Sequence, residues 1–215
     1  HSFPTRRSSD LNKIINFLGM LRYFKKLFYM NDALQNILLR NSPRELSEPI
    51  PSSEEMELVY KAALRAPDHA WQRPSRFIEV TGGGLKKLSS VFKKFALENI
   101  DELSEEVLAK YEEAPFRAPM IIILISEIKE HPKVPEIEQM FSTAAAAENI
   151  LLALNSLGYA GVWRTGKFAL DDRISKYLNL PDNQKVIGYL YVGTATGKQK
   201  KIPELKPSEF VTKWD

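Results

Sequence analysis

The segment 136–157 constrains the fold more than any other part of this chain. Apolar residues recur at helical spacing from Ile137, four alanines follow at 144–147, and the second half of the segment leaves little polar surface. A helix that is apolar nearly all round must be buried. We therefore expect this helix to pack against a sheet on one side and another subunit on the other, and Gly158 to end it as its C′ residue.

The remaining elements follow from hydrophobic periodicity and from capping and breaking residues. Ser52 and Glu55 form a capping box, and the apolar run at 120–125 is typical of a central strand. We expect strands over 76–81, 120–125, 159–163 and 185–194, and helices over 32–40, 53–64, 85–98, 104–114 and 170–179. In the first of these helices, Leu34, Ile37 and Leu38 are expected to form the buried stripe. Helices and strands interleave without a repeat or linker, which indicates one α/β-type domain around a mixed sheet.

The first 29 residues stand apart from the rest. Residues 1–11 show no periodicity and resemble a translated sequencing-adapter scar. Residues 12–29 place apolar side chains on one helical face and basic ones on another, which is typical of a helix lying on a membrane surface. We favour the alternative that this stretch is not native and that the protein starts at Met30. The folded domain is accordingly expected over 30–215.

Charge and composition exclude several classes of protein. Residues 1–30 carry a net charge of +5, whereas the remaining residues sum to −2, so the body lacks the basic footprint of a nucleic-acid binder. The longest apolar run is too short to cross a bilayer, and we expect no integral membrane segment. The chain contains no cysteine, which excludes disulfides and thiolate sites and suits a reducing compartment such as the cytoplasm.

Common catalytic and nucleotide-binding motifs are incomplete or missing. Gly82–Gly84 resembles a dinucleotide-binding loop, but Lys87 stands where the third glycine is required. Gly193–Lys198 is one residue too short for a phosphate-binding P-loop. The body has two histidines, too few for an imidazole zinc site, and we expect no metal. A hydrolase Gly-x-Ser-x-Gly elbow is missing as well.

Basic and hydroxyl residues gather instead at the ends of the predicted elements. Arg40-Asn41-Ser42 follows the first helix, Arg65 and His69 flank a proline-fixed turn, and Trp163-Arg164-Thr165 ends a strand. Guanidinium and hydroxyl groups are suited to hold a phosphate. Each group also has a purely structural explanation, so spacing alone leaves a functional site and a structural role open.

Several strings occur in an order that resembles a known family. They are Arg40-Asn41-Ser42, Leu64–His69, Pro74 with Arg76-Phe77, Ala114–Pro119, Lys133–Pro135 with Glu138-Gln139, Gly161–Gly166 and Gly188–Thr194. Together they resemble the small, single-domain branch of the FMN-dependent nitroreductases, from residue 30 to the end of the chain.

This resemblance implies an α+β fold with a mixed, largely antiparallel sheet flanked by helices, and a homodimer with FMN at the subunit interface. It also implies an FMN-binding set consisting of Arg40, Asn41, Ser42, Arg65, His69, Trp163, Arg164 and Thr165. Asn41 departs from the second arginine that is usual in the family. No catalytic side chain is expected, because a flavin carries out hydride transfer itself.

The function that the resemblance implies is an NAD(P)H oxidoreductase. It would work by ping-pong hydride transfer from NAD(P)H through FMN to nitroaromatic, quinone or related small-molecule acceptors. The alternative is a dimer that binds or scavenges flavin without reductase turnover. These two hypotheses differ in whether NAD(P)H reduces the bound flavin.

Overall fold

The structure is a computed structural model that describes residues 32–198 and 200–214, so the expectations for residues 1–29 lie outside the described residues. The chain divides into two compact units between Leu39 and Arg40. In the first unit the structure describes helix α2 (Asp32–Leu39), none of whose residues is buried. The predicted buried stripe is therefore wrong: Leu34, Ile37 and Leu38 are 46%, 52% and 47% exposed. A helix of about two turns has no core of its own in which to bury them.

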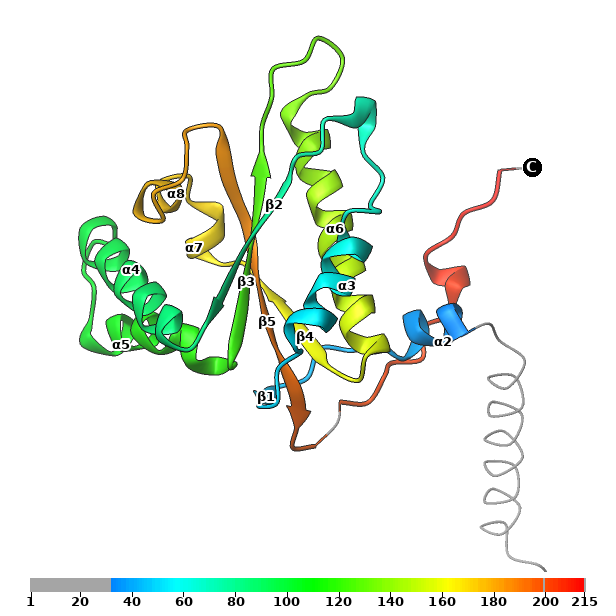
Figure 1. Cartoon of the computed structure of the whole chain (residues 1–215), viewed down its shortest axis with the longest axis horizontal. Coiled ribbons are helices and arrows are strands. Elements are labelled where there is room, and N and C mark those ends of the chain that lie inside the picture. Colours follow the sequence, from blue (N-terminus) through cyan, green and yellow to red (C-terminus); the bar gives the residue numbers. More distant parts are fainter. Residues whose placement is uncertain (1–31, 199, 215) are drawn as a thin grey trace, which may run out of the picture. The chain divides into compact units, whose positions relative to one another are not determined.

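The second unit, from Arg40 onward, holds one sheet with helices on both sides (Figure 1). Its elements in chain order are β1 (Glu45–Ser47), α3 (Ser53–Ala63), η1 (His69–Trp71), β2 (Ser75–Thr81), α4 (Gly83–Asn99), α5 (Glu105–Glu113), η2 (Ala114–Arg117), β3 (Met120–Glu127), α6 (Glu136–Ser156), β4 (Ala160–Arg164), α7 (Lys167–Leu170), α8 (Ile174–Tyr177), β5 (Gln184–Thr196) and η3 (Pro207–Glu209).

Strand β5 is the spine of the sheet. The strand order is β1-β5-β3-β2, with β4 also paired to β5, and all the ladders among the described residues are antiparallel. Opposite Tyr189 of β5 lie Ile123 of β3 and Arg164 of β4. The sheet thus matches the predicted largely antiparallel arrangement.

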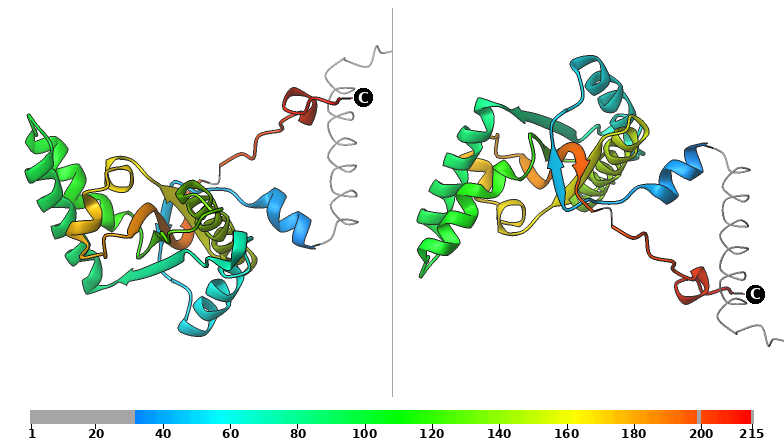
Figure 2. Two further views of the ribbon diagram at one scale, coloured as in Figure 1. Left: turned by 90° about the horizontal axis from the view of Figure 1, so that it is seen from above. Right: turned by 90° about the horizontal axis from the view of Figure 1, so that it is seen from below.

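Strand β3 feeds two hydrophobic cores because successive side chains of a strand point to opposite faces. Residues 121, 123 and 125 join Phe92 of α4 in one core, and residues 120, 122 and 124 join Ile150 of α6 in the other. Figure 2 shows α4 on one side of the sheet and α3 with α6 on the other. A strand buried on both sides explains why its sequence is continuously apolar.

Helix α6 covers the second face and ends as the sequence predicts. Gly158 follows it with a φ of 85°, a left-handed conformation that glycine adopts without strain. The inward side includes the polar Gln139 and Thr143, which are almost fully buried. Phe141 and Ile137 point outward and are 63% and 51% exposed. The sheet side of the prediction for this helix is thus confirmed, and its cover by another subunit stays a prediction.

Two local predictions need correction. The single helix expected over 170–179 is two short helices, α7 and α8, because Asp171 accepts hydrogen bonds from the backbone and side chain of Arg173 and makes a turn between them. Strand β1 was not predicted. It has only three residues next to prolines, and its formation depends on pairing with the distant end of β5.

Candidate functional site

The connection between α3 and β2 (residues 64–74) holds two predicted site residues, Arg65 and His69. Helix α3 begins with the predicted capping box, in which Ser52 Oγ accepts from Glu55 N and Ser52 N donates to the Glu55 carboxylate. Arg65 follows the end of this helix with an exposed side chain and makes no ion pair with a described residue. It lines a pocket of about 660 Å³ between the connection, β2 and α6.

His69 is fixed by the first turn of α6. Its Nδ1 lies 2.6 Å from a carboxylate oxygen of Glu138, and both side chains are about half exposed. A carboxylate bound to one ring nitrogen sets the ring orientation and leaves Nε2 for another partner. Glu138 therefore fixes the orientation of the His69 ring.

Arg40, Asn41 and Ser42 form a second group. Arg40 Nε lies 3.3 Å from Glu148 Oε1 of α6, but it is buried and has no hydrogen-bond partner among the described residues. The side chains of Asn41 and Ser42 are partly buried, and within the described part of the chain they make no hydrogen bonds. The polar side chains of Asn41 and Ser42 are thus uncommitted among the described residues, whereas the Arg40 guanidinium is paired with Glu148.

The end of β4 places its predicted residues on opposite sides of the sheet. Trp163 packs in the α6 core against Gly188, where an added Cβ would lie 2.0 Å from the indole Nε1. That Nε1 is buried and has no partner among the described residues. Arg164 projects the other way, with its Cζ 5.4 Å from the ring centre of Tyr191. Thr165 is exposed after the strand.

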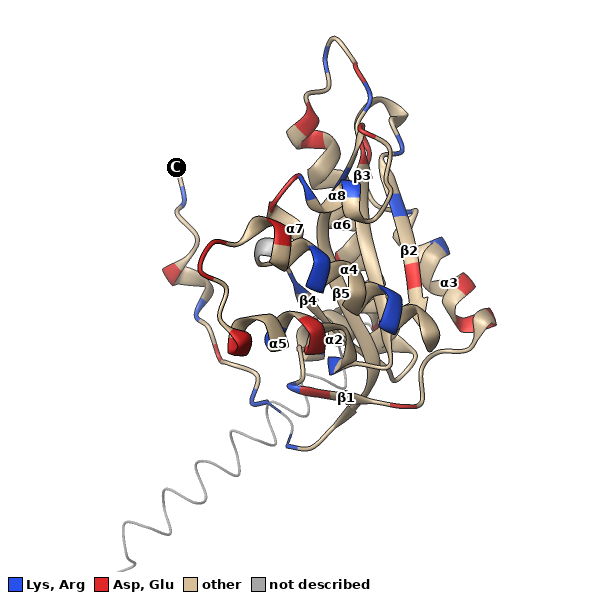
Figure 3. Ribbon diagram, turned by 90° about the vertical axis from the view of Figure 1, so that its left-hand side faces the viewer, with Lys and Arg blue, Asp and Glu red and all other residues tan. Residues whose placement is uncertain are grey.

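Charge around Tyr191 shows that Arg164 belongs to a positive region. Burial raises the pKa of the Tyr191 hydroxyl, and the positive charges of Arg117 and Arg164 oppose that rise. Neither arginine makes an ion pair with a described residue. Figure 3, which looks onto α4 and α5, shows basic and acidic residues interspersed elsewhere on this face.

A single chain brings together some of the predicted residues and not others. Arg65 and His69 share the α3–β2 connection, whereas Arg40 lies by α6 at Glu148 and Arg164 lies across the sheet. Of the predicted set, Arg65 alone lines the pocket beside the connection. A common FMN site for these arginines would require the expected subunit interface, which stays a prediction.

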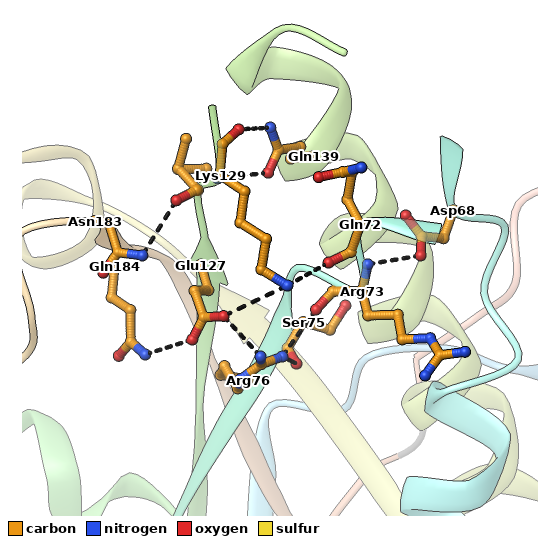
Figure 4. Close-up of polar contacts among 11 residues, drawn as sticks. Asp68, Gln72, Arg73, Ser75, Arg76, Glu127, Lys129, Gln139, Asn183 and Gln184 are labelled. Atoms are coloured by element: carbon orange, nitrogen blue, oxygen red, sulfur yellow. Dashed lines mark hydrogen bonds and ion pairs between the residues drawn. The ribbon is translucent and has the colours of Figure 1, made fainter. Parts of the chain in front are cut away.

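Two residues of this pocket, Trp71 and Arg73, are not among those predicted from the sequence. Both have a positive φ, 54° and 50°, and Arg73 N donates to the Asp68 carboxylate at 2.7 Å (Figure 4). The positive φ values have no local signal, because neither residue is glycine or asparagine. The string Trp71-Gln72-Arg73-Pro74 carries a weak signal, because a tryptophan and an arginine two residues apart in a connecting segment favour a binding role.

Comparison with known proteins identifies the family. The model of the Nitroreductase family matches residues 37–194. "Putative NAD(P)H nitroreductase YdjA" of Escherichia coli (strain K12) is 32% identical over 184 residues, which cover 84% of this chain and 98% of that protein. A "Putative NAD(P)H nitroreductase" of Haemophilus influenzae is 33% identical over 183 residues, with the same coverages. The chain belongs to the nitroreductase family.

Solved structures agree on the fold. A nitroreductase from Bacteroides fragilis, whose crystal structure has bound FMN, superposes with a TM-score of 0.69 at 23% identity and covers 86% of this chain and all of that one. A nitroreductase-like protein from Bacillus cereus gives a TM-score of 0.72 at 18% identity, covering 86% and 97%. The predicted family and α+β fold are confirmed, and membership of a reductase family confirms the prediction of an enzyme.

Other predictions concern metals, membranes and location. Within residues 32–198 and 200–214, no group of acidic, histidine or cysteine side chains is arranged to hold a metal ion. In the same residues, no helix has the length and hydrophobicity needed to cross a membrane. The cytoplasmic location and the roles of the individual site residues stay predictions.

Proposed function

We propose that this chain is an NAD(P)H-dependent FMN oxidoreductase that reduces nitroaromatic, quinone or related acceptors. The observation that carries the proposal is that the residues matching the family's flavin-binding strings keep uncommitted donors. Arg65 and Arg164 have exposed guanidinium groups without an acidic partner among the described residues. The fold and the family membership support the same conclusion.

The donor set fits the chemistry of FMN. The phosphate of FMN is a dianion, which guanidinium and hydroxyl groups bind through charge-assisted hydrogen bonds. Ser42, Thr165 and the arginines supply such groups. The indole N–H of Trp163, like Arg40 Nε, is a buried donor without a hydrogen-bond partner among the described residues, and its large apolar ring suits a position beside a flavin. A cation near the flavin ring also favours its reduced form.

The protein's part in the reaction is binding, orientation and electrostatics. Bound FMN would supply the redox chemistry, which in the proposed ping-pong cycle is hydride uptake from NAD(P)H and two-electron reduction of an acceptor. Two electrons and two protons convert a quinone to a hydroquinone, or a nitro group to a nitroso group and water. Arg40 and Arg164 would hold the phosphate, and Glu138 would keep His69 oriented toward the cofactor.

We further infer that the site is completed in a homodimer. The predicted residues occupy separate places on one chain, and exposed apolar side chains accompany them. Phe141 of α6 is 63% exposed and Leu64, next to Arg65, is 66% exposed. The C-terminal segment exposes further large apolar side chains, namely Leu205, Phe210, Val211 and Trp214. A second copy of the chain would remove this apolar surface from water.

An absorbance spectrum tests the proposal and separates it from its rival. The purified protein should be yellow, and anaerobic addition of NADH or NADPH should bleach the flavin bands. A protein that binds flavin without turnover would keep its oxidised spectrum after both additions. A colourless protein that does not take up added FMN would refute both hypotheses.

The substitution Arg164→Ala tests the cofactor site directly. Loss of a charge-assisted contact should weaken FMN binding by about 1.5–3 kcal/mol. The FMN dissociation constant, measured by flavin fluorescence, checks this. Lys87→Ala is the matched control, because it removes an exposed cation of α4 outside the proposed site. Equal FMN affinity in the Arg164 variant and the control would remove Arg164 from the site.

A further inference from the structure

The pocket beside the α3–β2 connection is lined in part by residues that the proposed FMN site does not include. Its volume is about 660 Å³, and its lining includes Arg65, Trp71 and Arg73 from the connection and Ser142 from α6. Arg65 also belongs to the predicted FMN-binding set, so the pocket adjoins the proposed redox site. Trp71 and Arg73 do not belong to that set.

Two of the three arginines in this pocket are free to bind an anion. Arg76 is committed: its guanidinium contacts Glu127 at 2.7 Å and donates to the backbone oxygens of Arg73 and Ser75. The guanidinium groups of Arg65 and Arg73 have no carboxylate partner among the described residues. In Figure 4 the Arg73 side chain extends away from the cluster around Glu127. Free guanidinium groups favour carboxylates and phosphates.

An aromatic surface lies next to the free charge. Trp71 is 80% exposed, and the Cζ of Arg73 lies 5.8 Å from the centre of its ring. An exposed indole offers a flat apolar face on which another ring stacks. The combination of a ring and a guanidinium suits a planar aromatic compound that carries a negative group.

The backbone holds these two side chains in a fixed arrangement. Ala70, Trp71 and Arg73 all have positive φ values between 50° and 54°, which non-glycine residues adopt only when the surroundings require it. Asp68 accepts from Arg73 N, and Lys129 Nζ donates to Gln72 O at 2.7 Å (Figure 4). Strain of this kind is concentrated at ligand-binding sites.

We propose that this pocket binds an aromatic ring bearing an anionic group, on a molecule that exchanges electrons at the adjoining site. This inference rests on the proposed function. The anion can be the carboxylate of an acidic nitroaromatic acceptor or the phosphate that distinguishes NADPH from NADH. Arg73 supplies the charge and Trp71 the stacking surface, which makes both of them residues that determine specificity.

Steady-state kinetics with the FMN-loaded protein distinguish the two sources. One arm compares kcat/KM for 4-nitrobenzoate with that for its neutral analogue 4-nitrobenzamide, and the other compares NADPH with NADH. We expect wild type to favour the member with the additional anionic group (4-nitrobenzoate or NADPH) in at least one pair. Arg73→Gln should reduce that preference about tenfold through KM, as expected for the loss of one charge-assisted contact, and leave the member without that group unchanged.

Two further variants serve as controls. Arg73→Lys keeps the charge and should retain most of the preference. Lys87→Gln removes an exposed cation of α4, outside this pocket, and should retain all of it. Unchanged preference in Arg73→Gln in both arms would overturn the proposal. A loss of FMN by Arg73→Gln with equal effects on all substrates would also overturn it, because the pocket would then serve the cofactor.

A binding measurement covers the case in which the protein has no turnover. Benzoate should quench the fluorescence of Trp71 more than benzamide does, and Trp71→Phe should abolish the difference. If NAD(P)H fails to reduce the flavin while benzoate still binds, the proposed function fails and the pocket remains an anion site. If benzoate shows no advantage over benzamide and NADPH shows none over NADH, the inference itself is wrong.

Discussion

The two faces of the sheet are built on different principles. On the α4 face, aromatic rings fill the core. The ring of Phe92 stacks on that of Phe168 with 3.9 Å between the ring centroids, and it meets the ring of Tyr189 edge-on with 5.3 Å between the centroids. On the α6 face, the buried members of the core are aliphatic or methionine, partly buried rings such as Trp163 pack against them, and Phe141 remains outside. All predicted site residues whose surroundings are described, except Arg164, lie on or next to the α6 face. The α4 face thus holds a core of buried aromatic rings, whereas the α6 face exposes the apolar side chain that we propose a second copy covers.

The largest effect should come from a substitution in the core of the α4 face. Phe92 is fully buried, so Phe92→Ala should reduce the free energy of unfolding by about 3–5 kcal/mol through lost burial and an unfilled cavity. Urea denaturation measures this. Phe92 lies in the core beneath α4, away from the exposed α6 side chains that the proposed dimer would cover, so the association state of the folded protein should not change. A Phe92→Ala variant that stayed folded but became monomeric would contradict this difference between the two faces.

On the α6 face, we expect a substitution to change association of the chains rather than folding stability. Phe141→Asp places a charge on the exposed side of α6 and should weaken dimerisation by about 2–4 kcal/mol, with little change in helix content. Sedimentation velocity over a range of concentrations measures the shift. Leu97→Asp is the matched control, because Leu97 of α4 is exposed to a similar degree, 56% against 63%. If both substitutions left a dimer intact, α6 would not form the interface.

Glycine positions on the two faces offer a finer comparison. At Gly188 an added Cβ would overlap the Trp163 indole, so Gly188→Ala should cost about 1–3 kcal/mol of stability and displace the ring. At Gly83, the first residue of α4, an added Cβ meets nothing within 4 Å. Gly83→Ala should leave stability unchanged or raise it by up to about 1 kcal/mol. Thermal denaturation measures both, and FMN binding should fall only in the Gly188 variant.

The smallest effect concerns alkaline pH. Burial raises the pKa of Tyr189 above its ordinary value of 10.0. A raised pKa in the folded state gives stability that is fully present below pH 10 and lost as the pH rises through the folded value. Tyr189→Phe should cost about 1 kcal/mol at neutral pH, because its hydroxyl donates to Phe168 O at 3.0 Å. Above pH 10 the variant should lose stability less steeply than wild type. Parallel pH dependences in urea denaturation from pH 8 to 11 would contradict this.

Local patterns predicted most elements because the relevant forces are local. The Ser52–Glu55 capping box, the Gly158 helix end and the apolar run of β3 were found from spacing alone. Elements that depend on distant partners were not. Strand β1 requires the end of β5, and the exposed stripe of α2 shows that an amphipathic pattern does not itself supply a surface to bury it.

The candidate site divides in the same way. The family resemblance of short strings predicts Arg40, Arg65 and Trp163 as cofactor-binding residues, and their guanidinium and indole groups suit a phosphate and a flat ring. The sequence did not show that Trp163 shares the α6 side of the sheet with the other predicted residues while Arg164 lies on the opposite side. It also did not show that Glu138 fixes the His69 ring. It also missed Trp71 and Arg73, whose left-handed backbone is imposed by Asp68 and Lys129.

By itself, the sequence determined the family, the helices and strands with strong periodicity, and the chemical character of the residues predicted to bind the cofactor. These properties depend on residue type and on spacing within a few turns of chain. Only the tertiary structure decided which side chains share a face, which guanidinium groups are neutralised and which remain free. Such choices depend on pairings between residues far apart in the chain, and the hydrophobic pattern constrains those pairings only through the sheet that it builds.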